Sequence, residues 1–214
     1  GLPRSGTSLM MQMLAAGGLA PQTDGRRSSD EDNPEGYHEW EAIRQLAANP
    51  AILEHPDLER RAVKCISALL PVLPARHRYR VIFMRRPIAE IAASQDAMLR
   101  RRGAAGTDQV PLETTMELLR RHLDDGLRFL EQHPRFFEVL EIDYPSLVAA
   151  PEPWIERIAA FLGPDLLPHP ERMAAAVQPA LHRHDVTRLS ASVPKIPRCG
   201  YLACTRARYL RAFS

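Results

Sequence analysis

Short apolar runs that are typical of buried strands alternate with segments of helical periodicity, and this alternation restricts the chain to few folds. The strand-like runs cover residues 62–66, 79–84 and 136–142. Helical periodicity covers residues 9–16, 37–48, 88–101, 112–132 and 154–162. Parallel strands need a crossover between them, which is usually a helix. The order therefore predicts an α/β domain, a three-layer sandwich with a central, mostly parallel sheet flanked by helices.

The composition is that of one soluble domain. The 214 residues are 45% hydrophobic and 25% charged, which suffices for a core without disulfides or metal ions. We expect a single domain over residues 1–214, irregular from 165 to 214 because proline recurs there. Cys65, Cys199 and Cys204 lack metal-ligand spacing, so we expect neither a zinc site nor a disulfide framework, and a reducing, cytoplasmic location fits best.

Charge and hydropathy argue against two further classes. The formal net charge of +2 does not suit a general nucleic-acid binder, whose affinity depends on many clustered phosphate contacts. No apolar stretch approaches the roughly 20 residues that cross a bilayer. The chain starts at Gly1 without a methionine, directly in a loop. We therefore expect an upstream strand to be missing, and an upstream signal or anchor stays open as well.

The opening sequence GLPRSGTSLM is a short loop that leads directly into a helix. Backbone N–H groups at a helix N-terminus meet at the positive end of the helix dipole and bind phosphate. Arg4 adds a cation, and Gly6 lets the backbone approach a ligand closely. Hydroxyl groups come from Ser5, Thr7 and Ser8. The alternative is an ordinary helix start with Ser or Thr as N-cap.

A second candidate anion site follows the strand predicted over residues 79–84. Arg86 leaves the end of this strand, and Ser94 lies eight positions later in the next helix. Eight positions are about two helical turns, so both side chains can meet at the carboxyl edge of the sheet, where open α/β sheets bind ligands. Each residue has an ordinary alternative: a surface salt bridge between Arg86 and Glu90, and a Ser94 hydroxyl bonded to its own helix backbone.

Together the two motifs resemble the sulfotransferase family that uses 3′-phosphoadenosine 5′-phosphosulfate (PAPS). PRSGTS at 3–8 is similar to the family's 5′-phosphosulfate loop, and RRPIAEIAAS at 85–94 is similar to its 3′-phosphate motif. The likeness covers about residues 1–185, with weaker blocks at 33–43, 143–163 and 177–186. The resemblance implies a P-loop-like fold and transfer of a sulfuryl group from PAPS to a hydroxyl or amine without a metal ion. The implied nucleotide ligands are Arg4, Ser5, Gly6, Thr7, Ser8, Arg86 and Ser94.

The acceptor must lose a proton, so a general base is needed. Cytosolic members of the family carry Lys-Thr-His before the 3′-phosphate motif, whereas residues 64–66 are Lys-Cys-Ile, without the histidine. Other members use a glutamate after the first helix, which makes Glu39 the candidate catalytic base beside Arg4 as catalytic cation. His38 and Asp24 rank behind Glu39. The alternatives are an exposed helix glutamate at 39 and a Lys64 that pairs with a buried carboxylate.

Two other functions stay open. A nucleotide or nucleoside kinase of related fold would carry a Walker lysine and a magnesium-binding carboxylate, and the sequence has neither in place. A non-catalytic nucleotide-binding module would keep the anion sites without turnover, and the absent histidine fits that alternative. The acceptor stays open among small molecules, carbohydrates, lipids and peptides, because specificity depends on segments such as residues 21–36 and the C-terminal part.

Overall fold

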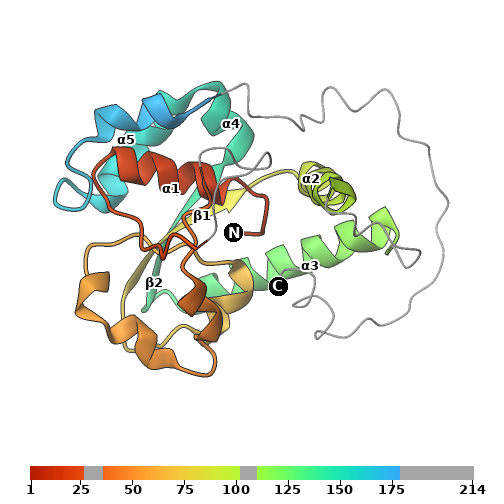
Figure 1. The fold of residues 1–214 in the computed structure, drawn as a ribbon, viewed down its shortest axis with the longest axis horizontal. Coiled ribbons are helices and arrows are strands. Elements are labelled where there is room, and N and C mark those ends of the chain that lie inside the picture. Colours follow the sequence, from red (N-terminus) through yellow and green to blue (C-terminus); the bar gives the residue numbers. More distant parts are fainter. Residues whose placement is uncertain (27–35, 102–109, 179–214) are drawn as a thin grey trace.

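The computed structural model describes residues 1–26, 36–101 and 110–178 (Figure 1). Its α-helices and strands are α1 Thr7–Ala16, β1 Tyr79–Arg85, α2 Ile88–Arg101, α3 Leu112–Gln132, β2 Phe137–Asp143, α4 Tyr144–Ala149 and α5 Pro151–Leu162. Its short 3₁₀ helices are η1 Glu41–Gln45, η2 Pro50–Glu54, η3 Pro56–Leu58, η4 Ser67–Val72 and η5 Pro170–Ala176. The predicted mixture of helices with a parallel sheet is confirmed.

Several predicted features lie partly outside the described residues. They are the loop at 21–36 and the block at 33–43, which both extend into residues 27–35, and the block at 177–186 and the irregular C-terminal segment, which both extend beyond residue 178. Cys199 and Cys204 lie wholly outside.

Two parallel strands form the sheet of the described residues. β1 pairs with β2 in register, from Tyr79 opposite Phe137 to Arg85 opposite Asp143. The connection between them contains α2 and α3. Because the strands are parallel, both end at the same edge, where Arg86 and Tyr144 follow them in the chain. This edge is the one at which open α/β sheets bind ligands.

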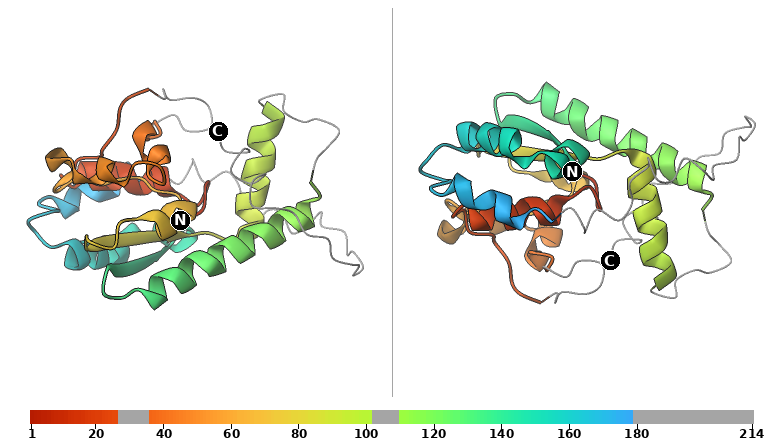
Figure 2. Two further views of the ribbon diagram at one scale, coloured as in Figure 1. Left: turned by 90° about the horizontal axis from the view of Figure 1, so that it is seen from below. Right: turned by 90° about the horizontal axis from the view of Figure 1, so that it is seen from above.

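Different helices cover the two faces of the strand pair (Figure 2). One face packs against α3 and η4, through Phe83, Phe137 and Leu130, which are at most 5% exposed. The other face packs against α1, α4, α5 and η5. The strands are apolar on both sides for this reason, as is typical of parallel strands.

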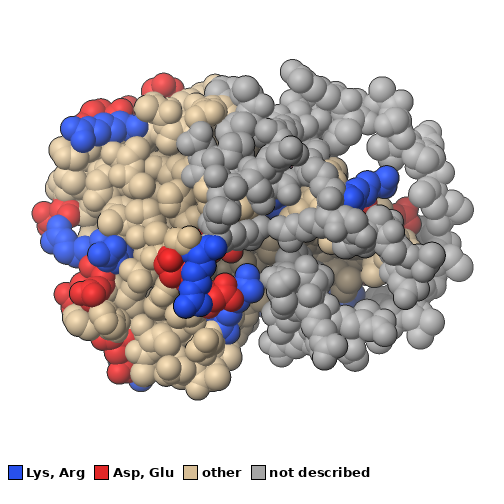
Figure 3. Space-filling view, in the orientation of Figure 1, with Lys and Arg blue, Asp and Glu red and all other residues tan. Residues whose placement is uncertain are grey.

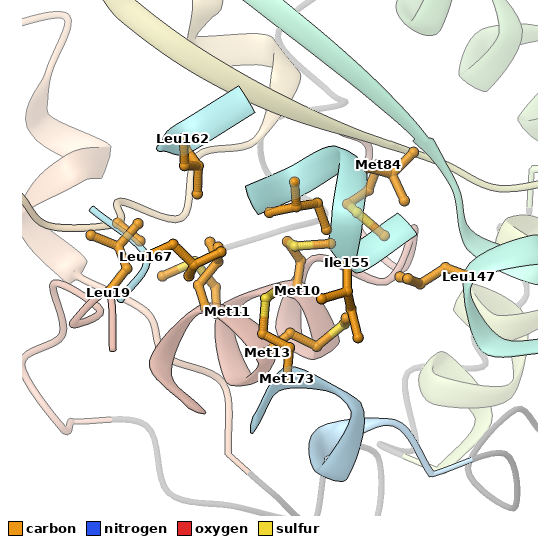
Figure 4. Packing of buried hydrophobic residues seen from close by; sticks show 14 of the residues in the cluster. Met10, Met11, Met13, Leu19, Met84, Leu147, Ile155, Leu162, Leu167 and Met173 are labelled. Carbon is orange, nitrogen blue, oxygen red and sulfur yellow. The ribbon is translucent and has the colours of Figure 1, made fainter. Parts of the chain in front are cut away.

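The core on the α1 face is rich in methionine (Figure 4). Met10 and Met13 of α1 meet Met84 of β1 and Met173 of η5, and all four are at most 3% exposed. Unbranched methionine side chains adapt to irregular spaces between elements that cross at different angles. This core fixes α1, and with it the turn before α1, against the strands.

Charged side chains on the described surface lie in small groups of mixed sign. In the view of Figure 3, basic and acidic residues are neighbours rather than parts of a patch of one sign. Several such neighbours are ion pairs, for example Arg85 with Glu141 at 2.9 Å and Arg44 with Glu41 at 3.3 Å.

The strand predicted over residues 62–66 is wrong. Within the described residues, Ala62 forms only an isolated parallel bridge with Pro21, and it exchanges backbone hydrogen bonds with Ala20 and Gln22. At the other end of the run, the Ser67 N–H donates to the Gly1 carbonyl at 3.0 Å. Ala62 belongs to the apolar cluster that contains the buried residues of α1, but the run forms no ladder with β1.

The helix predicted over residues 37–48 is also wrong in extent. The structure has only η1, Glu41–Gln45, and the Trp40 backbone before it is extended, with φ −120° and ψ 105°. Ile43 and Leu46 are buried three positions apart, a spacing that is also typical of one face of a longer helix. The helices predicted at 9–16, 88–101, 112–132 and 154–162 are confirmed, with α1 and α5 starting two and three residues earlier.

Candidate functional site

The turn before α1 contains two residues with left-handed backbone conformation. Arg4 has φ 69° and Gly6 has φ 98°. Between them, Ser5 donates its hydroxyl to the Leu2 carbonyl at 2.6 Å and its N–H to the same oxygen at 3.2 Å. Ser5 is 1% exposed, so its hydroxyl holds the turn together. Tight turns of this kind form concave arrangements of backbone N–H groups that suit an anion.

The N-terminus of α1 follows this turn directly and has no side-chain cap among the described residues. Gly6 is the N-cap residue, so the alternative of a Ser or Thr N-cap is wrong. Thr7 and Ser8 begin the helix, and the N–H groups of a first turn have no partner within the helix. These groups lie at the positive end of the helix dipole, where a negatively charged ligand is favoured.

Gly6 is required by its neighbour as well as by its backbone. A Cβ atom at residue 6 would lie 2.2 Å from Cδ2 of Tyr144, the first residue of α4. The Tyr144 ring therefore packs directly on the turn, and burial raises the pKa of its hydroxyl. From the sequence, Gly6 was expected to let the backbone approach a ligand closely. In the structure, Gly6 also leaves the space that the Tyr144 ring occupies.

The two anion motifs are in direct contact. Arg4 Nε donates to Ser94 Oγ at 2.9 Å, although the residues are 90 positions apart. Ser94 lies on α2 and is 1% exposed, so its hydroxyl accepts a hydrogen bond from the other motif. The opening turn and the middle of α2 thus lie in contact.

Arg86 lies beneath this contact in a buried ion pair. Its Nε donates to Glu90 Oε2 at 2.8 Å, and the two side chains are 8% and 2% exposed. The expected salt bridge is therefore present, but it is buried rather than on the surface. Arg86 NH1 also donates to the Arg4 carbonyl at 3.2 Å. The guanidinium carbon lies 4.7 Å from the centre of the Tyr144 ring, a cation–π distance.

Lys64 links the anion turn to the candidate base. Its Nζ donates to Ser8 Oγ at 3.0 Å and to the Tyr37 carbonyl at 2.8 Å. The same ammonium lies 3.5 Å from Glu39 Oε1, and the two side chains are 12% and 27% exposed. One alternative paired Lys64 with a buried carboxylate. The structure pairs it with Glu39 beside the start of α1, a carboxylate that is only partly buried.

The other two candidate bases have different surroundings. His38 has a left-handed backbone with φ 48°, and its pKa is lowered first by burial and then by the nearby Lys64 ammonium. Asp24 accepts hydrogen bonds from the backbone N–H groups of Glu41 at 2.8 Å and Arg26 at 3.2 Å. The bond from Glu41 is the main cause that holds the pKa of Asp24 below its usual range. Asp24 therefore holds η1 against the preceding segment.

Sequence reasoning missed two features of this region. It paired Glu90 with Arg86, four positions apart, but placed the pair on the surface, whereas the structure buries it. Tyr144 lies in the weaker block at 143–163, where no residue was assigned to the site. Its contact with Gly6 depends on the tertiary fold and has no local signal in the sequence.

Within residues 1–26, 36–101 and 110–178, no group of three or more His, Cys, Asp or Glu side chains could hold a metal ion. In the same part of the chain, none of the helices has the length and apolar character needed to cross a membrane.

Burial raises the pKa of the Cys65 thiol to about 11, so this cysteine is a poor nucleophile at neutral pH.

Comparison with known proteins gives one match. The model of the sulfotransferase family matches residues 61–168, which include Lys64, Arg86, Ser94 and Tyr144 but neither the opening turn nor Glu39. Searches of curated proteins and of solved structures find no match. Since the family model covers half of the sequence, and the matched half contains the motif at the end of β1, the chain belongs to the sulfotransferase family.

Proposed function

We propose that the chain is a PAPS-dependent sulfotransferase. It would transfer a sulfuryl group to a hydroxyl or amine of a small molecule, carbohydrate, lipid or peptide. The observation that carries the proposal is the hydrogen bond between Arg4 and Ser94 at 2.9 Å. It joins the motif suited to the 5′-phosphosulfate to the motif suited to the 3′-phosphate. The proposed fold is a P-loop-like three-layer sandwich, of which β1 and β2 form part of the central sheet.

The proposed nucleotide site uses backbone dipoles and arginine instead of a metal ion. At the 5′ end, the N–H groups after Gly6, the Thr7 and Ser8 hydroxyls and the Arg4 guanidinium hold the phosphosulfate. Ser5 contributes by fixing the turn through the Leu2 carbonyl. At the 3′ end, Arg86 and Ser94 hold the phosphate. Arg4 of the first motif and Ser94 of the second already contact each other in the structure, so the two motifs do not have to be brought together when the nucleotide binds.

The proposed chemistry is an in-line displacement. PAPS supplies the sulfuryl group when it is bound. Glu39 takes the proton of the acceptor hydroxyl as the acceptor oxygen forms its bond to sulfur, and the bond between sulfur and the bridging oxygen breaks. Arg4 stabilises the negative charge that develops on that leaving oxygen, which departs with adenosine 3′,5′-bisphosphate. Lys64 keeps the Glu39 carboxylate beside the start of α1, since it contacts both Glu39 and Ser8.

The test is transfer of radioactive sulfate from labelled PAPS to a panel of phenols, sugars, lipids and tyrosine peptides. We expect at least one labelled product, and we expect Arg4→Ala to reduce its formation by roughly 10²–10³-fold, the effect of removing one donor to a developing oxyanion. Arg100→Ala is the matched control, because Arg100 is an exposed arginine on α2 whose partner is Asp96. Tight binding of adenosine 3′,5′-bisphosphate without transfer to any acceptor would instead favour the non-catalytic module.

A further inference from the structure

A buried carboxylate lies directly behind the anion turn. Glu90 is in the first turn of α2, and its side chain is 2% exposed. An ionised carboxylate at such a depth needs a close cationic partner, because burial removes its hydration. Arg86 is that partner at 2.8 Å. Neither the sequence motifs nor the proposed chemistry assigns a function to Glu90.

The pair extends from Glu90 to the backbone of the turn. Arg86 uses Nε for Glu90 and NH1 for the Arg4 carbonyl, at 2.8 Å and 3.2 Å. Two bonds on different nitrogens of a planar guanidinium fix both its position and its plane. Arg4 has φ 69°, a conformation that L-residues other than glycine adopt at a cost. The hydrogen bond from Arg86 to the Arg4 carbonyl therefore stabilises a backbone conformation that is unfavourable by itself.

The second left-handed residue of the turn is held by the same guanidinium. Arg86 stacks on Tyr144 with 4.7 Å between the guanidinium carbon and the ring centre. The Tyr144 ring in turn occupies the space where a Cβ of residue 6 would be. Arg86 thus supports Arg4 directly and Gly6 through Tyr144, and Glu90 fixes Arg86.

We propose that Glu90 is a positioning residue for the anion turn: through Arg86 it sets the backbone at Arg4 and Gly6, and so the direction of the Arg4 guanidinium and of the N–H groups that begin α1. The proposal rests on the proposed function for its effect on catalysis, but not for its effect on the turn. It gives Arg86 a second task besides the 3′-phosphate, and it assigns Glu90 no contact with the nucleotide.

The main test compares Glu90→Gln with Asp96→Asn. Both changes replace an α2 carboxylate by an amide beside an arginine four positions away, but the pair of Asp96 with Arg100 is 42% and 67% exposed. We expect Glu90→Gln to lower kcat for sulfuryl transfer by roughly 10²-fold, as small displacements of catalytic groups do. The KM for PAPS should change less. Asp96→Asn should leave both unchanged, and equal effects of the two variants would overturn the proposal.

A double-mutant cycle tests whether Glu90 acts through Arg4. The affinity for adenosine 3′,5′-bisphosphate is measured by calorimetry for the wild type, Glu90→Gln, Arg4→Ala and the double variant. We expect a smaller loss from Glu90→Gln when Arg4 is already alanine, because the Arg4 side chain it orients is gone. Fully additive losses would show that Glu90 acts independently and would contradict the proposal.

A structural readout separates this proposal from the proposed function. In ¹H–¹⁵N spectra, the Gly6 amide should shift in Glu90→Gln and stay in place in Asp96→Asn, while circular dichroism stays the same. If Glu90→Gln does not fold, Arg86→Lys serves instead: it keeps both charges but loses the planar fork, and it should move the same resonance. An unmoved Gly6 amide would overturn the proposal even in an active enzyme. A wild-type protein that binds no bisphosphate would contradict the proposed function alone.

Discussion

Gly6 is the residue whose replacement tests the anion turn most simply. Gly6→Ala adds a methyl group 2.2 Å from the Tyr144 ring and places alanine at φ 98°. We expect a loss of about 3 kcal/mol in the free energy of unfolding, the sum of the backbone and overpacking costs. Gly25→Ala is the control, since Gly25 has φ 65° and open space around it. It should lose only about 1–2 kcal/mol. Urea unfolding gives both values, and equal losses would remove Tyr144 from the explanation.

Glu39 is the residue on which the proposed proton transfer depends. Glu39→Gln keeps the shape of the side chain beside Lys64 but cannot accept the proton. We expect kcat to fall by roughly 10²–10⁴-fold, with little change in the affinity for adenosine 3′,5′-bisphosphate. Glu41→Gln is the control two residues away, at an exposed carboxylate that pairs with Arg44. Steady-state kinetics and calorimetry measure the two quantities. If the Glu39→Gln enzyme keeps its activity, Glu39 is not the general base and another group, such as His38, takes the proton.

At the scale of elements, the segment before η1 is held by Asp24. The Asp24 carboxylate accepts the Glu41 and Arg26 N–H groups, and the Thr23 hydroxyl donates to the Glu39 carbonyl at 3.0 Å. We expect Asp24→Asn to lower the free energy of unfolding by about 1 kcal/mol at pH 7. Asp125→Asn, at an exposed pair on α3, should change it little.

This effect has a defined pH dependence. The pKa of Asp24 is lower in the folded protein than its usual value, so its charge stabilises the fold above the unfolded pKa of about 3.9. That stabilisation is lost as the pH falls through the folded value. Unfolding midpoints of the wild type and Asp24→Asn should therefore approach each other between pH 5 and the acid limit of about pH 2. If the two midpoints instead differ by the same amount at every pH, the charge of Asp24 does not contribute to the stability of the fold.

Elements with a strong, local pattern could be predicted from the sequence. β1, β2, α2 and α3 lie where their apolar periodicity placed them, because each contributes residues to a buried apolar cluster. Residues 62–66 have the composition of a strand but lack a continuous hydrogen-bonding partner within the described residues. Residues 37–48 have buried positions at helical spacing, yet Trp40 is extended. Pairing partners and local backbone geometry are tertiary properties that composition does not specify.

The site could be predicted in part for the same reason. Arg4, Arg86 and Ser94 carry a recognisable chemistry at fixed spacings, and the structure brings them together. The depth of the Arg86–Glu90 pair could not be predicted, because burial depends on Tyr144 and the turn, which are far away in sequence. The hydroxyl of Ser5 looked like a ligand group, but it bonds to Leu2 within the turn.

Across the whole molecule, the proposed nucleotide would bind two parts of the chain that are far apart in sequence. α1 packs on one face of the strands, and α2 follows β1 at their carboxyl edge. A ligand bound to both would stabilise the folded state by about 2.7 kcal/mol at a concentration of 100 times Kd. For a chain of this size we expect the Tm to rise by roughly 5–10 °C. Adenosine 5′-phosphate at the same concentration should raise the Tm less than the bisphosphate does. In Ser94→Ala, the Tm increases caused by the two nucleotides should differ less than in the wild type. Equal shifts in the wild type would argue against a site for the 3′-phosphate.

The central claim is that the turn before α1 and the start of α2 bind the two ends of one nucleotide. A crystal structure with adenosine 3′,5′-bisphosphate tests it most directly. We predict the 5′-phosphate within hydrogen-bond distance of Arg4 and the first N–H groups of α1, and the 3′-phosphate within reach of Arg86 and Ser94. A nucleotide bound elsewhere, or with both phosphates away from the N-terminus of α1, would contradict the claim.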